Sequence, residues 1–204
     1  MWSLLTAKKN TRSKAYDIAK PYLKKDVEVE VLDFPMVDLE KNRNLLQKKW
    51  KDNAQKASEL LQSGKNVGMI TLGDPMIYST YSYLIDDLQE MGESVVTVSG
   101  IPSFCASAAL LGIPIAQGNE SFCVLTGIQS EEEITRALAE FENVIIMKAK
   151  GSRDLVNQAI QKHGLQECTY HVTDCGGQQE RTDRGYLPEK MSYFTLTIIK
   201  NKGR

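Results

Sequence analysis

The chain of 204 residues carries 25 Lys and Arg against 26 Asp and Glu, which leaves a formal net charge of -1. This balance excludes a global field suited to nucleic acid or an anionic membrane surface, so a charged partner has to be recognised locally. Hydrophobic residues make up 42% of the sequence, enough for a packed core. No apolar run approaches the roughly twenty residues that span a bilayer, and no signal-peptide core is present. With four cysteines scattered along the chain, we expect a cytoplasmic protein without disulfides.

The first third of the sequence alternates helical and strand-like patterns. Residues 1–12 carry basic and polar side chains without a glycine-rich turn, and we assign them no element. Residues 13–23 predict a short helix that Pro21 ends or kinks. The valines of residues 27–31 alternate with glutamates, which predicts a strand with one solvated face. A long amphipathic helix follows from Asp38, a candidate N-cap, to Gly64.

The stretch that follows combines a buried strand with a loop suited to a ligand. Residues 67–72 form a short apolar run, which Gly73, Asp74 and Pro75 break. Ser79 is a plausible N-cap for a helix that ends at Gly92. In open α/β sheets, ligands bind beyond the carboxyl ends of strands. Asp74 could accept hydrogen bonds from a ligand there, or it could equally cap a turn through its own backbone.

A second loop of the same kind follows a predicted strand at residues 94–98. The strand breaks at residues 99–102, and a helix runs from Ser103 to Gly112. Two such loops on one parallel sheet can flank a shared ligand, although both could be simple connections. Residues 113–119 read as a linker, so we predict domains at 1–116 and 117–204.

The second domain also reads as α/β, with antiparallel pairing late in the chain. Ser130 and Glu133 form a capping-box signature before one helix, and Ser152 is the expected cap of another that ends at Gly164. The predicted strands are residues 121–126, 143–148, 168–173 and 193–200.

Few residues indicate chemistry on their own. Cys168, His171 and Cys175 have the types and spacing of zinc ligands, but they lack a fourth ligand and a knuckle turn, so we favour a strand and expect no metal. The sequence contains neither a phosphate-loop motif nor a dinucleotide fingerprint. Their absence argues against an enzyme that hydrolyses nucleotides or transfers a hydride. Some other nucleotide enzyme stays open. Lys148, Lys150, Arg181 and Arg184 could bind carboxylates or simply be surface charges.

Two separated motifs carry a family resemblance. LGDPMIYSTYSYL at residues 72–84 and VSGIPSFCASAALLGIP at residues 98–114 resemble the tetrapyrrole methylases, two-domain S-adenosylmethionine enzymes of cobalamin and sirohaem synthesis. AYDIAKPYL, VEVEVLDFPM and YFTLTIIK are similar to the subgroup that methylates C-20 of precorrin-2. The resemblance implies two α/β domains, the first with a mainly parallel sheet and the second with a mixed sheet.

The resemblance also implies a site. S-adenosylmethionine would lie between the domains, with S-adenosylhomocysteine as the product, and Tyr78 is a weak candidate for a base that removes a proton from the substrate. The residues that would contact the cofactor are Leu72, Gly73, Asp74, Ile77, Tyr78, Ser79, Thr80, Pro102, Ser103, Met147 and Gly176. The implied substrate is precorrin-2 or its cobalt form, and the family implies a homodimer.

This sequence departs from the family pattern in two places. Members open with a strand and a loop resembling GxGPGDPxLLT, which this chain lacks, so we expect the first domain to lack that first strand and loop. The usual PGI(T/S)S motif reads SGIPS at residues 99–103, with Pro102 in place of a hydroxyl. The alternatives are therefore a binding-only or inactive fragment, or a methylase for another ring position.

Overall fold

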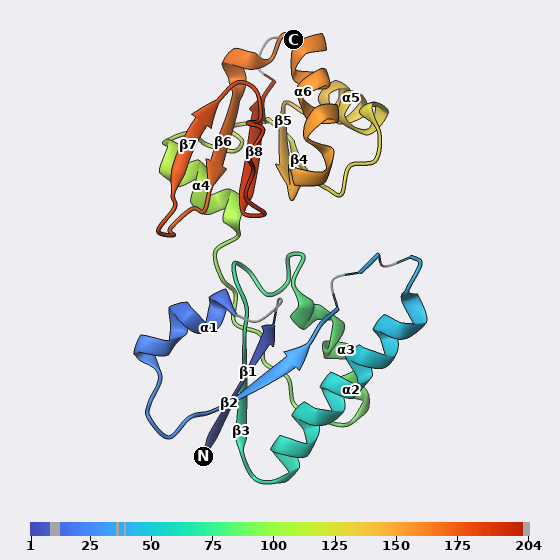
Figure 1. The fold of residues 1–204 in the computed structure, drawn as a ribbon, viewed down its shortest axis with the longest axis vertical. Coiled ribbons are helices and arrows are strands. Elements are labelled where there is room, and N and C mark those ends of the chain that lie inside the picture. The colour runs from blue at the N-terminus through green and yellow to red at the C-terminus, as the bar shows by residue number, and fades with distance from the viewer. Residues whose placement is uncertain (9–12, 36, 39, 202–204) are drawn as a thin grey trace. The chain divides into compact units, whose positions relative to one another are not determined.

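The computed structural model describes residues 1–8, 13–35, 37–38 and 40–201, which form two compact units. They are Met1–Ile101 and Pro102–Arg204, and each holds its own sheet, as the predicted α/β class requires (Figure 1). The contact boundary lies before the predicted linker at residues 113–119, because helix α4 (Ser103–Leu111) packs against strand β8 (Thr195–Lys200) of the second unit. None of the described helices is long and apolar enough to cross a membrane.

The first unit contains a three-stranded sheet in the order β2-β1-β3. Both pairings are parallel, which confirms the predicted parallel sheet. The strands are β1 (Trp2–Lys8), β2 (Glu28–Asp33) and β3 (Asn66–Ile70). The helices are α1 (Lys14–Ala19), α2 (Arg43–Gln62) and α3 (Ile85–Glu90), with 3-10 turns at Lys20–Tyr22 and Thr80–Tyr83.

Strand β1 is the central strand of this sheet, although we assigned no element to residues 1–12. Ser3, Leu4, Leu5 and Thr6 are all buried, so both faces of the strand are covered. A parallel strand covered on both faces shows no alternation of polar and apolar residues, which is the signal that sequence reading depends on. Residues 9–12, which follow β1, lie outside the described residues, and the expected lack of the family's opening strand and loop stays a prediction.

The strand predicted at residues 94–98 is wrong, because this segment has no regular secondary structure. Val95 packs against the first unit's core, whereas Val96 and Val98 are 83% and 79% exposed. Thr97 between them is exposed as well, so only Val95 of this segment turns inward. What is missing among the described residues is a hydrogen-bonded neighbour, without which a strand does not form.

Helix α2 begins later than the predicted Asp38. The Asp38 Oδ1 atom accepts hydrogen bonds from the backbone N–H groups of Glu40 and Lys41, each at 3.0 Å, and so caps the turn before the helix. The end agrees with prediction, because Gly64 adopts a left-handed φ of 82° and its N–H bonds to the Leu61 carbonyl.

The second unit contains a five-stranded mixed sheet in the order β4-β5-β8-β6-β7. Strand β4 pairs in parallel with β5, and the other pairings are antiparallel, as predicted for the late strands. The remaining bounds are β4 (Phe122–Thr126), β5 (Asn143–Met147), β6 (Thr169–Thr173), β7 (Arg181–Arg184), α5 (Glu131–Glu140) and α6 (Arg153–Lys162), with 3-10 turns at Ala149–Ser152 and Gln166–Cys168.

The core of the second unit lies between the sheet and α5 with α6. Val144, Ile146 and Ile199 share one buried cluster with apolar residues of both helices. Ile145 and Ile198 pair directly across β5 and β8 and are also fully buried, so they cover the opposite face of the sheet. Ser130 caps α5 as predicted, since its Oγ accepts the Glu133 N–H, but the Glu133 carboxylate accepts the N–H of Gln129, one residue before the N-cap, rather than that of Ser130.

His171 serves the sheet, as we expected when we weighed it against a zinc ligand. Its ring is 1% exposed, with Nδ1 2.9 Å from Thr197 Oγ1 and Nε2 2.8 Å from the Gly185 carbonyl. Both ring nitrogens are therefore engaged by protein atoms. Within the described part of the chain, no group of three or more His, Cys, Asp or Glu side chains has the arrangement of a metal site.

Burial of His171 predicts a loss of stability in mild acid. Desolvation lowers the pKa of the ring below its ordinary 6.5, and the opposing contributions of the Gly185 carbonyl and Asp183 are smaller. The unfolded chain then binds the proton first, so this stabilisation is complete above pH 6.5 and is lost as the pH falls below it. We expect the urea midpoint to decrease from pH 7.5 to pH 5.5, with a smaller decrease in His171→Gln.

Candidate functional site

The loop after β3 is built around the carboxylate of Asp74. Gly73 reverses the chain with a left-handed φ of 73°, which a residue with a side chain rarely adopts. Asp74 Oδ1 then accepts the Met76 N–H at 2.8 Å, and the Asp74 carbonyl accepts the Ile77 N–H at 3.2 Å. Asp74 thus caps its own turn, one of the two roles that its sequence position suggested.

The same carboxylate joins this loop to the segment that precedes α4. Asp74 Oδ2 accepts the Ser99 hydroxyl at 2.7 Å and the Gly100 N–H at 2.9 Å. A Cβ atom on Gly100 would lie 2.2 Å from the carbonyl oxygen of Gly73, so only glycine allows this approach. Hydrogen bonds within the first unit therefore join the first predicted loop, at Asp74, to the start of the second, at Ser99 and Gly100.

The three donors around Asp74 predict a low pKa for its carboxyl group. The Met76 N–H, the Ser99 hydroxyl and the Gly100 N–H, in decreasing order of effect, lower the pKa below its ordinary 3.8, and desolvation opposes them weakly. The bonds stabilise the loops above that pH and are lost as the carboxyl is protonated below it. An NMR titration of the Asp74 carboxyl carbon should give a value below 3.8, and a value at or above 3.8 would contradict the bonded loop.

The rest of the first loop turns into a 3-10 segment rather than one continuous helix. Ser79 Oγ accepts the Tyr81 N–H at 3.2 Å, so Ser79 is an N-cap as predicted, but of the turn Thr80–Tyr83. It also bonds to Thr71 Oγ1 at 3.1 Å, across the loop. Helix α3 then starts at Ile85, so the single helix predicted from Ser79 to Gly92 is wrong.

The predicted contact residues of this loop differ in their exposure. Ser79 is buried, whereas Leu72 and Tyr78 are exposed. Tyr78 has a φ of 50°, which is strained for an aromatic residue, and such strain often marks functional positions. Ile77 and Thr80 are the other predicted contacts in this segment. All the predicted cofactor contacts of the first unit therefore lie within residues 72–80.

The four remaining predicted residues belong to the second unit. Pro102 is the N-cap residue of α4, where its carbonyl accepts the Ala106 N–H, and Ser103 is the first helical residue. Met147 ends β5 and Gly176 follows β6. Strands β5 and β6 both run antiparallel to β8, so their carboxyl ends lie at the same edge of the sheet.

Two further residues at this sheet edge have left-handed backbones. Lys148 directly follows β5 with a φ of 58°, and Asp174 directly follows β6 with a φ of 51°. Each position costs conformational energy for a residue with a Cβ, so each is fixed by its surroundings. Sequence analysis named Lys148 only as a charged residue that could bind carboxylates, and it did not name Asp174. A left-handed backbone at a non-glycine residue has no local sequence pattern that would predict it.

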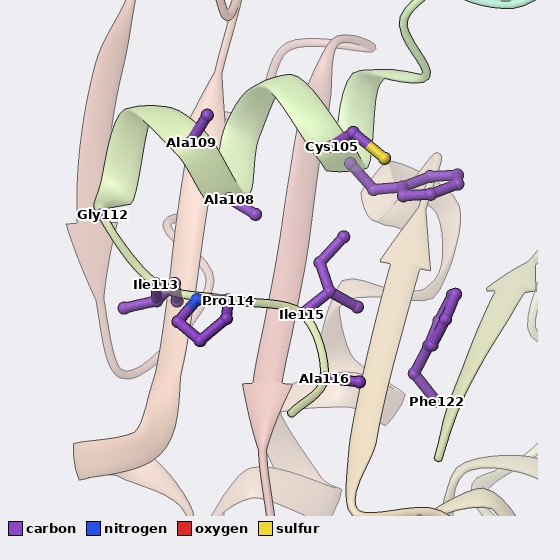
Figure 2. Close-up of a pocket in the computed structure, with 10 residues that line it drawn as sticks. Cys105, Ala108, Ala109, Gly112, Ile113, Pro114, Ile115, Ala116 and Phe122 are labelled. Carbon is purple, nitrogen blue, oxygen red and sulfur yellow. The ribbon is translucent and has the colours of Figure 1, made fainter. Parts of the chain in front are cut away.

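An apolar groove runs along α4 in the second unit (Figure 2). Its volume is about 600 Å³, within the range of small-molecule sites. The lining residues are uncharged, namely Phe104, Cys105, Ala108, Ala109, Gly112, Ile113, Pro114, Ile115, Ala116 and Phe122. None of them is a predicted cofactor contact, and sequence analysis treated residues 113–116 only as linker.

A smaller cavity of about 240 Å³ lies at the start of α6. Lys150 and Arg153 line it with Ser152, while Asp154 and Glu189 contribute negative charge. Arg153 NH2 already pairs with Asp154 at 2.6 Å. The lining residues Lys150–Leu155 come shortly after β5, so they are close in sequence to Met147 and Lys148.

Comparison with known proteins places these features in a family. The family model for Tetrapyrrole (Corrin/Porphyrin) Methylases matches residues 5–190. The chain is 32% identical to the cobalt-precorrin-2 C(20)-methyltransferase of Salmonella typhimurium, over 96% of this chain and 82% of that enzyme. It is 39% identical to the probable cobalt-precorrin-2 C(20)-methyltransferase of Methanocaldococcus jannaschii, over 71% of this chain but only 58% of that protein.

A solved structure agrees with the fold. The uroporphyrin-III C-methyl transferase of Thermus thermophilus, in complex with S-adenosylhomocysteine, superposes with a TM-score of 0.63 at 17% identity. The superposition covers 97% of this chain and 84% of that one. With a family model that matches most of its length, the chain belongs to the tetrapyrrole methylases.

Proposed function

We propose that the protein transfers a methyl group from S-adenosylmethionine to C-20 of cobalt-precorrin-2 or precorrin-2, in cobalamin biosynthesis. The observation that carries the proposal is the bonded pair of loops around Asp74, in a chain whose relatives are named for this reaction. The first loop follows strand β3 and the second follows a segment of strand-like composition, and open α/β sheets bind ligands beyond the carboxyl ends of strands. A different ring position remains the alternative.

The first loop offers main-chain polar groups and exposed side chains to a ligand. A carboxylate has about four acceptor positions, and three of those of Asp74 are used by the protein. Asp74 therefore acts mainly by fixing the loops. Main-chain groups around Gly73 would meet the polar part of the cofactor, and the exposed side chains of Leu72 and Tyr78 its apolar part.

The second unit would supply the remaining contacts. Pro102, Ser103, Met147 and Gly176 are the proposed cofactor residues there. At position 102 the proline leaves only main-chain oxygen as a polar group, and that oxygen already accepts the Ala106 N–H. We therefore expect Ser103 rather than Pro102 to provide any side-chain hydrogen bond to the cofactor.

Bound S-adenosylmethionine supplies an electrophilic methyl group on a sulfonium centre. The protein's own contribution is to hold the acceptor carbon at near-attack distance and to exclude water, which can account for much of the rate. Tyr78 is the proposed base for the proton that leaves the acceptor carbon. Two observations support that role for Tyr78: it lies on the strained loop, and its ring is exposed.

The substrate carries several carboxylates, and the chain's net charge of -1 gives them no general attraction. We propose that Lys150 binds one of them from the cavity at the start of α6. Arg153 is a weaker candidate because Asp154 partly neutralises it. We further propose that the protein is cytoplasmic and forms a homodimer. It would bind no metal, membrane or nucleic acid.

A methyl-transfer assay tests the function. The purified chain is incubated with S-adenosylmethionine and either precorrin-2 or cobalt-precorrin-2, and the products are examined by mass spectrometry and NMR. We expect one added methyl group at C-20, and methylation at another carbon would identify another ring position.

Calorimetry separates an inactive enzyme from a wrong assignment. Binding of S-adenosylhomocysteine without turnover would indicate a binding-only fragment. Absence of binding at millimolar ligand would overturn the active-enzyme proposal for this chain. Tighter binding of ATP or NAD than of S-adenosylhomocysteine would favour a nucleotide enzyme instead.

A further inference from the structure

Tyr81 is not among the predicted cofactor contacts, yet it lies between the two loops that Asp74 joins. Its side chain is 9% exposed, and the Ser79 hydroxyl fixes its backbone by accepting the Tyr81 N–H at 3.2 Å. Ser79 is in turn bonded to Thr71, directly after β3, with 3.1 Å between the two hydroxyl oxygens. A buried tyrosine usually directs its own hydroxyl to a polar partner. Tyr81 is therefore a fixed residue whose hydroxyl has a defined direction.

The partner of this hydroxyl belongs to the segment that leads into the second loop. The Tyr81 hydroxyl oxygen lies 2.6 Å from Thr97 Oγ1. Within the described chain, residues 94–98 belong to no β-ladder, and Val95 packs against the first unit's core. The bond between Tyr81 and Thr97 is thus an additional attachment for a segment that has no regular secondary structure.

The position of Thr97 in the sequence decides what this attachment can do. Two and three residues later, the Ser99 hydroxyl and the Gly100 N–H donate to Asp74 Oδ2 at 2.7 Å and 2.9 Å. An extended chain advances at most about 3.6 Å per residue, so the Cα atom of Ser99 lies within about 7 Å of that of Thr97. A shift at Thr97 would therefore reach both donors, and with them the close approach of Gly100 to the Gly73 carbonyl.

We propose that Tyr81 is a positioning residue of the cofactor site: its bond to Thr97 holds the start of the second loop against Asp74. The two loops are then joined in two places, by the Asp74 carboxylate and by the Tyr81 hydroxyl. Two attachments fix the direction of a short segment as well as its distance, whereas one attachment lets it pivot. Because Tyr81 is buried, it acts through the loop and offers a ligand little surface. The inference rests on the proposed function, since the site is the one proposed for S-adenosylmethionine.

Two variants that each remove one hydroxyl and keep the side-chain shape test the proposal. In Tyr81→Phe and Thr97→Val, Ser99 and Gly100 should be held less firmly, so the pKa of Asp74 should rise toward its ordinary 3.8. An NMR titration of the Asp74 carboxyl carbon measures this rise. Calorimetry should show affinity for S-adenosylhomocysteine reduced about fivefold, as expected for one hydrogen bond between neutral groups. Thr97→Ser, which keeps the hydroxyl, should restore both values.

The double variant and a neighbouring tyrosine provide the controls. Tyr81→Phe combined with Thr97→Val should bind S-adenosylhomocysteine no more weakly than either single variant, because all three lack the same bond. Tyr83→Phe changes a tyrosine of the same 3-10 turn, and its ring keeps the stacking on Trp50 at 4.1 Å between centroids. We expect this variant to bind normally.

The readouts separate positioning from a contribution to stability alone. A bond that only stabilises the fold would lower the urea midpoint of Tyr81→Phe without changing the pKa of Asp74 or the affinity, and that result would overturn the proposal. A raised pKa with unchanged affinity would overturn it as well. If the unaltered chain binds no S-adenosylhomocysteine, the proposed function fails, whereas a raised pKa of Asp74 in the variants still supports the positioning of the second loop by Tyr81.

Discussion

Gly100→Ala should abolish S-adenosylhomocysteine binding and lower the rate of methyl transfer about a hundredfold, since a displacement of about 1 Å at a site can have that effect. The added methyl group would lie 2.2 Å from the Gly73 carbonyl oxygen and 3.3 Å from the Asp74 Cα atom. Both neighbours are backbone atoms, so neither can move away without displacing its loop. The Gly100 N–H would then lose its bond to Asp74. Calorimetry and the methyl-transfer assay measure the two effects.

Gly68→Ala is the matched control for this variant. Gly68 lies in β3 of the same unit, but a Cβ there would meet Leu4 and Trp2 side chains at 3.9 Å or more, an ordinary contact. We expect it to bind S-adenosylhomocysteine normally. Normal binding by Gly100→Ala would mean that the close approach of the two loops does not form the cofactor site.

Asp74→Ala should weaken S-adenosylhomocysteine binding about tenfold while the fold stays intact, because hydrogen bonds to a charged group are the stronger ones. The substitution leaves the Met76 N–H, the Ser99 hydroxyl and the Gly100 N–H without their shared acceptor. The loops can then separate, whereas the strands and α2 keep their own packing. Calorimetry gives the affinity, and circular dichroism with urea unfolding checks the fold.

Ser99→Ala provides a graded comparison, because it removes one of the three bonds and keeps the carboxylate. Its effect on affinity should be smaller than that of Asp74→Ala. If Asp74→Ala binds with unchanged affinity, Asp74 is a turn residue and the bonded loops are not a ligand site.

Much of the second unit was predictable because its elements carry strong local signals. Helix α5 begins where Ser130 caps it through the Glu133 N–H, and β5 matches the apolar run at residues 143–148. The prediction that His171 belongs to a strand rather than a zinc site rested on alternation, and its two ring bonds are consistent with it. In each case a local sequence pattern indicates the element, although contacts with distant residues complete it.

The first unit was harder to predict because its features depend on residues distant in sequence. β1 lacks alternation because both of its faces are buried, and residues 94–98 have a strand-like composition but no ladder partner among the described residues. The family motif pointed to Asp74 and to residues 99–103. It could not show that one carboxylate binds three donors, or that Gly100 lies against Gly73, because both depend on tertiary contacts.

The central position of β1 also bears on how the chain is made. β1 leaves the ribosome before both of its partner strands, and its partner on one side is β3, with Trp2 opposite Asn66. β1 can therefore pair along both edges only after the segments that connect it to β2 and to β3 have been synthesised. Such non-local parallel pairing is slow and exposes apolar chain in the meantime. Assembly of this sheet should therefore be the slow step in the folding of the first unit during synthesis.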